Sequence, residues 1–327
     1  MTTIRLFIRF SLALGFFQIL IPVAWPQAYP VKPVRIIVPG SAGSGDTLAR
    51  LIADGMSQVM GQQSIVEARP GANGIIATDI AAKSPADGYT VFLANIAQAA
   101  SVSLYRNLPF DLERDFSAVT QVVSSPHVLI LHPSLPVTSV KDLIQLAKLK
   151  PGTINYSSVG VGSSTFLAAE LFKSQAQVDI LHIPYKGGGP ALTALLSGET
   201  SVYLAPLASA LPQIRANTVR ALAVTTAKRI PLTADIQTVA EAGLPGYEFA
   251  NWYGFLVPAK TPKERIAALR SATISALNRD EVRKRIMDLS YITVGDQSEE
   301  FSAYIKTEIA KLTKLTRDLR LTVDAPL

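Results

Sequence analysis

The chain has 327 residues, enough for two domains of roughly 100 to 200 residues each, and its hydrophobic share of 48% excludes a largely disordered protein. The formal net charge is +6, but the 31 lysines and arginines are scattered without a long basic run, so we expect no nucleic-acid partner. With no cysteine and three histidines, the sequence excludes disulfides and thiol catalysis and predicts no metal cluster.

The N-terminus has the charge order of a secretory signal peptide, which we assign to residues 1–28. Arg5 and Arg9 precede an apolar stretch at residues 12–24, and no acidic residue occurs in this region. The stretch is shorter than the ~20 residues that a spanning helix needs, and an uncleaved anchor is the alternative. We predict cleavage, export to the periplasm and a mature chain that begins near Tyr29.

The first part of the mature chain alternates strands, turns and helices. A β-branched run at residues 34–38 predicts a buried strand, and a helix with apolar residues at helical spacing extends to Gly61. The turn between them, residues 40–46, is rich in glycine and serine, and Ser44 or Asp46 would cap the helix. The pattern then predicts a turn at residues 69–74, a helix at residues 75–83 and a strand at residues 89–93.

Two extended segments are candidates for crossings between two lobes. Predicted strands at residues 119–123 and 128–131 lie on either side of residues 124–126, which would form the first crossing. Residues 247–257 form a second extended segment that would make the return crossing. Beyond Pro262 the pattern is mostly helical and charged.

Two more strand, turn and helix units lie in the middle of the chain. Their strands are predicted at residues 154–158 and 179–184, and their turns, residues 159–165 and 185–190, are again rich in glycine. This alternation predicts an α/β fold with largely parallel sheets, on which ligands bind beyond the carboxyl ends of strands. Amides at such helix starts bind anions, although a single turn of this kind is ordinarily only a cap.

No catalytic constellation is visible in the sequence. There is no G-x-S-x-G elbow, and no turn completes a nucleotide-binding motif. His127 and His132 flank a predicted strand, and His182 lies inside an apolar one, where a structural histidine is expected. We therefore predict a binding protein without a cofactor rather than an enzyme.

Eight segments of the mature chain carry a family resemblance. They are YPVKPVRIIVP (29–39), DTLAR (46–50), RPGANG (69–74), PADGYT (85–90), IPYKG (183–187), RALAVT (220–225), AEAGLPGYE (240–248) and WYGFLVPAKTP (252–262). In their order and spacing they resemble the Bug family, the extracytoplasmic solute receptors of tripartite tricarboxylate transporters.

The resemblance implies a two-lobe α/β periplasmic binding protein of the type II arrangement, with a mainly parallel sheet in each lobe and two crossing segments. Residues 29–124 and 250–327 would form lobe 1, and residues 125–249 would form lobe 2. It also implies a small carboxylate held between the lobes and delivery to integral-membrane transporter subunits. We expect a monomer, and the alternative function is a solute sensor that presents a bound carboxylate to a signalling receptor.

The resemblance places the solute among three loops. The loop after the first strand would hold a carboxylate by backbone groups and ordered water, the glycine and hydroxyl loop of lobe 2 would face it, and a third turn would complete the wall. The residues so implied are Ser41, Ala42, Gly43, Ser44 and Asp46, then Gly160, Gly162, Ser163, Ser164, Thr165 and Phe166, then Tyr185, Lys186 and Gly187.

The chain departs from the family pattern at four places. The first loop is one residue shorter than usual, Ala194 replaces an acid, and Thr200 and Ser201 replace a valine and an aspartate. Phe166 stands where the family has a histidine. This change predicts a ligand with one strongly held carboxylate and a less polar or aromatic remainder, unless Phe166 turns into the core of lobe 2.

Overall fold

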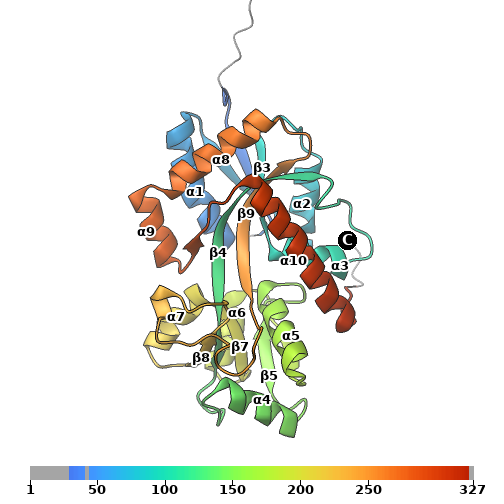
Figure 1. Ribbon diagram of the computed structural model, residues 1–327, viewed down its shortest axis with the longest axis vertical. Coiled ribbons are helices and arrows are strands. Elements are labelled where there is room, and N and C mark those ends of the chain that lie inside the picture. Colours follow the sequence, from blue (N-terminus) through green and yellow to red (C-terminus); the bar gives the residue numbers. More distant parts are fainter. Residues whose placement is uncertain (1–28, 41–43, 324–327) are drawn as a thin grey trace, which may run out of the picture.

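The computed structural model describes residues 29–40 and 44–323, and the predicted signal peptide lies outside these residues. Two lobes are stacked along the long axis of the molecule, joined by strands β4 (Phe116–Leu131) and β9 (Ala250–Pro258) (Figure 1). No helix in the described part of the chain has the length and apolar composition that a membrane span requires.

The sheet of lobe 1 combines the first strands of the chain with the two crossing strands. β1 runs parallel to β2 and β3, and β9 lies between β3 and β4, antiparallel to both. A short strand, β10, pairs antiparallel with the middle of β4. The bounds are β1 (Val34–Val38), β2 (Ser64–Ala68), β3 (Thr90–Asn95) and β10 (Ile292–Thr293).

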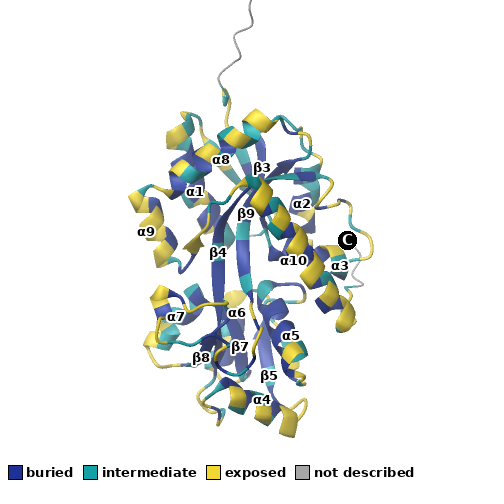
Figure 2. Cartoon of the chain, in the orientation of Figure 1, coloured by how far each residue is buried: buried dark blue, intermediate teal, exposed yellow. Residues whose placement is uncertain are grey.

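Helices cover both faces of this sheet, which explains the continuous apolar run of β1. Ile36 packs into one core cluster and its neighbour Ile37 into the other, because successive side chains of a strand point to opposite faces. Figure 2 shows that the buried residues gather along the strands and on the inner sides of the helices. One face carries α1 (Ser44–Met60), α8 (Lys263–Leu277) and α9 (Asp280–Asp288), and the other carries α2 (Ile75–Ala82), α3 (Ile96–Leu104) and α10 (Ser298–Asp318).

The sheet of lobe 2 has its strands mostly in one direction. β5 lies between β6 and β7, parallel to both, and β4 runs antiparallel to β7 and β8. The strands are β5 (Asn155–Ser158), β6 (Leu181–Pro184), β7 (Val202–Pro206) and β8 (Arg220–Val224). Helices α6 (Gly188–Leu196) and α7 (Leu207–Arg215) pack on one face, and α4 (Val140–Leu149) and α5 (Ser164–Ala176) on the other.

The first crossing is one continuous strand rather than two strands with a break at residues 124–126. β4 pairs with β9 up to Pro126, which lies opposite Ala250, and it pairs with β7 from His127 onward. Proline has no backbone N–H to donate, so it is tolerated at the point where the strand changes partners. The prediction of two separate strands was therefore wrong.

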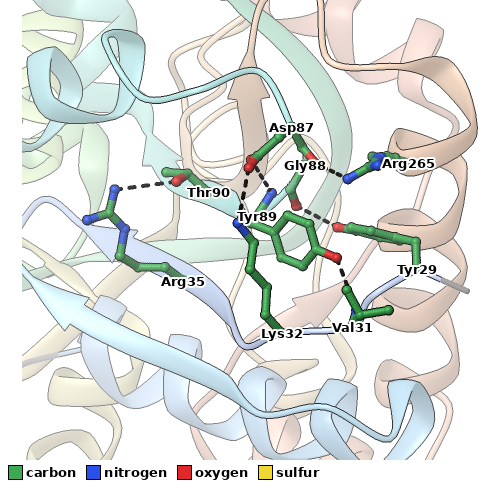
Figure 3. A network of polar contacts seen from close by, with 9 residues as sticks. All are labelled: Tyr29, Val31, Lys32, Arg35, Asp87, Gly88, Tyr89, Thr90 and Arg265. Carbon is green, nitrogen blue, oxygen red and sulfur yellow. Dashed lines mark hydrogen bonds and ion pairs between the residues drawn. The ribbon is translucent and has the colours of Figure 1, made fainter. Parts of the chain in front are cut away.

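The predicted start of the mature chain lies in a polar network on lobe 1 (Figure 3). Tyr29 donates a hydrogen bond from its hydroxyl to the carbonyl of Gly88 at 2.5 Å, and the guanidinium of Arg265 lies 5.0 Å from the centre of its ring. The hydroxyl of Tyr89 accepts from the amide of Val31 at 3.0 Å. These contacts fix the segment before β1 to the turn before β3.

Candidate functional site

Segments of both lobes meet at the carboxyl ends of β1 and β5. Gly74, which precedes α2, lies so close to Pro39 that a Cβ built on it would be 2.8 Å from the proline Cβ. Asn73, in the short helix η1 (Ala72–Gly74), faces lobe 2, because a Cβ built on Gly162 would lie 2.8 Å from its Nδ2. Such a Cβ would also lie 3.0 Å from Leu104 Cδ1. The glycine-rich loop of lobe 2 therefore touches lobe 1 at this edge.

That loop turns sharply from β5 into α5. Gly160 and Gly162 adopt φ of +109° and +81°, a left-handed region that favours glycine. Ser163 is the N-cap of α5, with its hydroxyl donating to the carbonyl of Gly160 at 2.6 Å and accepting from the amide of Phe166 at 3.3 Å. Thr165 Oγ1 accepts from the amide of Val159 at 3.1 Å. Both hydroxyls thus serve the loop itself.

The backbone amides at the start of α5 are available to an external acceptor. Ser164 and Thr165 occupy the first turn, where no intrahelical carbonyl can reach the N–H groups. Their amides have no hydrogen-bond partner among the described residues. The helix dipole adds positive potential at this end, so the start of α5 favours an anion.

The hydroxyl of Ser164 is held by a buried histidine. His127, on β4, is fully buried, and its Nδ1 lies 3.2 Å from the carbonyl of Ser125, which can only accept. Nδ1 therefore carries the proton, and Nε2 accepts from Ser164 Oγ at 3.1 Å. Burial lowers the pKa of His127 to about 4, so the ring is neutral at pH 7. Sequence reasoning assigned His127 no role at this site.

The described part of the first loop shows how Asp46 is placed. This residue lies in the first turn of α1 and is 8% exposed. Arg50, one turn later, donates to its carboxylate from Nε at 2.8 Å and from a terminal nitrogen at 3.0 Å. The Asp46 charge is therefore balanced within its own helix. Ser41, Ala42 and Gly43 lie outside the described residues, as does the Ser44 side chain.

The third predicted segment lies beside the loop of lobe 2, because the amide of Tyr185 donates to the carbonyl of Ser158 at 2.9 Å. The Tyr185 hydroxyl donates to Glu199 at 2.8 Å, and burial together with this carboxylate raises the pKa of Tyr185 to about 12. Gly187 is the N-cap of α6 with φ of +111°, and Lys186 is exposed. Tyr185 is thus fixed to lobe 2 by its side chain.

Phe166 is 3% exposed and belongs to the core cluster that fills one side of lobe 2. The centre of its ring lies 4.9 Å from that of His182. His182 Nε2 lies 2.6 Å from Ser158 Oγ, which accepts from the amide of Gly160 at 3.0 Å. Burial lowers the pKa of His182. Of the two placements considered for Phe166, the structure shows the core.

Asn73 is the polar side chain at this edge that sequence reasoning missed. Its Nδ2 is buried and has no hydrogen-bond partner among the described residues. The sequence signal was the Gly-Ala-Asn-Gly run, since asparagine before glycine is typical of a left-handed turn. Its position against lobe 2 depends on how the lobes pack and carries no such signal.

Comparison with known proteins identifies the family. A family model for the tripartite tricarboxylate transporter family receptor matches residues 48–321. The chain belongs to this family. Protein BugT of Bordetella pertussis is 31% identical to this receptor over 316 residues, which cover 95% of this chain and 97% of BugT. The resemblance to the Bug family is thereby confirmed, and the family is one of receptors rather than enzymes.

Solved structures confirm the fold of this receptor. Rpa4515 of R. palustris with adipate superimposes with a TM-score of 0.80 at 36% identity, covering 88% of this chain and 97% of that one. MatC of Rhodopseudomonas palustris with bound malate gives a TM-score of 0.78 at 28% identity, covering 88% and 99%. Periplasmic binding protein BugD also superimposes, with a TM-score of 0.79 at 28% identity, so the α/β fold of a periplasmic solute-binding protein is shown.

A separate groove lies on lobe 1 between α8 and α10, beside the first residues of β4. Its lining includes Lys263, Arg270 and Lys306 together with Glu299. None of the predicted site residues that the structure describes lines this groove. It is a second place where an anion could meet positive charge, and it is distinct from the glycine-rich loops.

Proposed function

We propose that this receptor works in the periplasm, where it captures a small carboxylate between its lobes and delivers it to a tripartite tricarboxylate-type membrane transporter. The observation that carries the proposal is the start of α5, where the amides of Ser164 and Thr165 have no partner among the described residues and the adjoining Gly162 faces Asn73 of lobe 1. Adipate and malate, bound by the structural relatives Rpa4515 and MatC, support a carboxylate as ligand class.

The carboxylate would be held mainly by uncharged groups of lobe 2. The hydroxyls of Ser163 and Thr165 shape the loop, and His127 fixes Ser164, so the backbone amides stay aimed at the anion without rearrangement. Such preorganised donors stabilise a negative charge without burying a full positive one. The anion can then leave when the lobes separate.

Residues of the other two loops would complete the site. Ser41, Ala42, Gly43, Ser44 and Asp46 would contribute to the site from lobe 1, and Tyr185, Lys186 and Gly187 would form the wall beside the lobe 2 loop. Lys186 is exposed and would attract anions at long range rather than bind them directly. We expect the receptor to act as a monomer.

The ligand class is tested by melting curves of the mature chain, residues 29–327, with a panel of mono-, di- and aromatic carboxylates. A ligand at 100 times its dissociation constant should stabilise the protein by ~2.7 kcal/mol. The proposal expects at least one carboxylate to raise the melting temperature, while neutral sugars and cationic amino acid esters leave it unchanged. No response to any carboxylate would contradict it.

Delivery to a transporter needs a separate test in cells. Deleting the gene should abolish uptake of the radiolabelled acid identified in the melting screen, and expression of the full chain should restore it. If uptake persists while a transcriptional response to the acid disappears, the chain is a sensor and the transport part of the proposal is wrong.

A further inference from the structure

The turn that carries Asn73 has an unusual backbone. Four consecutive residues, Gly71 to Gly74, have φ of +126°, +45°, +52° and +89°. Glycine adopts such angles freely and asparagine tolerates them, but Ala72 is strained there. Strain of this kind persists only where the surroundings hold it, and it is concentrated at ligand clamps and other functional sites.

The amide nitrogen of Asn73 is a buried donor, although the residue as a whole is only partly buried. Its Nδ2 has no hydrogen-bond partner among the described residues, although it is closed off from solvent. Buried donors are almost always paired, because leaving one unpaired costs free energy. An unpaired donor in a strained turn therefore points to a partner that binds there.

Other amide side chains nearby already accept hydrogen bonds through their oxygens. Gln98 Oε1 accepts from the amide of Asn95 at 2.9 Å, and Asn95 Oδ1 accepts from the amide of Ala97 at 2.8 Å, as a capping box at the start of α3. Asn251 Oδ1 accepts from the amide of Ile96 at 3.3 Å. These oxygens fix α3, whereas Asn73 Nδ2 faces the loop of lobe 2 at Gly162.

We propose that Asn73 Nδ2 donates a hydrogen bond to a carboxylate oxygen of the bound solute. The inference rests on the proposed function and adds a lobe 1 donor to it. The carboxylate is then bound from lobe 2 by the amides at the start of α5 and from lobe 1 by Asn73, so a single anionic group bridges the two lobes. The strained turn holds the donor in place before the solute arrives.

The test separates the side chain of Asn73 from the backbone it occupies. Asn73→Gly removes the amide but suits the left-handed backbone better than asparagine does. Asn73→Asp keeps the size and replaces the donor with a negatively charged acceptor. Asn217→Gly is the matched control, because Asn217 has a φ of +54° and lies exposed at the end of α7.

Affinities for adipate, malate and benzoate are measured by calorimetric titration, together with melting temperatures. We expect Asn73→Gly to lower the affinity of the tightest of these acids about ten- to a hundredfold while the unliganded protein melts at the same or a higher temperature. Asn73→Asp should weaken binding at least as much. Asn217→Gly should bind as tightly as the wild type.

Three results would overturn the inference. If Asn73→Gly binds as tightly as the wild type, Asn73 is only a turn residue, and the proposed function is unaffected. If the wild type binds none of the acids, both the inference and the carboxylate ligand fail. An equal loss of affinity in Asn217→Gly would also overturn it, since the effect would then come from the backbone change.

Discussion

Ser164 and His127 join the start of α5 to the strand that crosses between the lobes, through a 3.1 Å contact between Ser164 Oγ and His127 Nε2. The His127 ring also packs edge-on against Phe249, which is the residue before the return strand β9. The centres of the two rings lie 5.4 Å apart. One buried imidazole thus contacts both crossing segments and the helix start that we propose as the anion site.

Stability should depend on the protonation of His127. Its pKa is 6.5 in the unfolded chain and about 4 when folded, because burial disfavours the charged ring. Between pH 4 and pH 6.5 the unfolded chain binds a proton at His127 that the folded protein does not bind. The contribution of the neutral, buried ring to the free energy of unfolding is therefore complete above pH 6.5 and is lost as the pH falls toward 4. The loss amounts to about 3 kcal/mol.

Urea unfolding of the wild type and of His127→Gln at pH 7 and pH 4 measures this contribution. The variant should be less stable at pH 7 but should lose less stability on acidification, since other titrating groups are common to both proteins. Parallel losses in the two proteins would show that His127 does not titrate as its burial requires.

Ser163→Ala should destabilise the receptor by about 1 kcal/mol, the usual cost of removing an N-cap. The Ser163 hydroxyl already donates to the carbonyl of Gly160, so no donor remains for a ligand. Melting curves and calorimetric titration distinguish the two roles. A lower melting temperature with unchanged affinity is expected, and a tenfold loss of affinity would show a direct contact with the solute.

Gly162→Ala should weaken carboxylate binding more than Gly160→Ala does. Both glycines have positive φ, so each substitution strains the backbone by about 1 to 2 kcal/mol. Only at Gly162 would the new methyl group press on Asn73 and Leu104, because a Cβ at Gly160 meets no described atom within 4 Å. Equal affinities for the two variants would show that the contact of Gly162 with lobe 1 is unimportant for carboxylate binding.

Phe166→His should lower stability by about 1 to 3 kcal/mol and leave the ranking of ligands unchanged, because it places a polar ring in the core beside His182. Benzoate, citrate and malate are compared on both proteins. A wild type that prefers benzoate, together with a variant that prefers citrate, would instead support the aromatic-acid hypothesis and a Phe166 that moves to face the ligand.

The signal peptide assigned to residues 1–28 predicts that the exported, mature chain begins near Tyr29. N-terminal sequencing of protein from an osmotic-shock fraction should give Tyr29 or a residue close to it. Tyr29 is hydrogen-bonded to Gly88, so cleavage just before it would leave the network at that end of lobe 1 intact. Recovery of intact Met1 with the membrane pellet would contradict the prediction.

Local patterns in the sequence predicted most of the elements around the site. The β-branched run of β1, the helix that ends at Gly61 and the glycine-rich turn before α5 all depend on neighbours within a few residues. Pro126 led to the wrong prediction of two strands, since a proline normally interrupts a strand, yet here it lies where β4 exchanges one partner strand for another.

The parts of the site that sequence could not predict are those made by long-range packing. His127 and Ser164 are 37 positions apart, and Asn73 meets Gly162 only because the lobes pack together. Whether a buried hydroxyl serves a loop or a ligand likewise depends on which carbonyl lies within reach, as for Ser163 and Gly160.

The most direct test of the proposed site is an electron-density map of the mature receptor crystallised with its tightest-binding carboxylate. We predict density for a carboxylate between the lobes, within hydrogen-bond distance of the amides of Ser164 and Thr165 and of Asn73 Nδ2. Density for the acid only in the groove lined by Lys263, Arg270 and Lys306 would contradict the proposed site between the lobes.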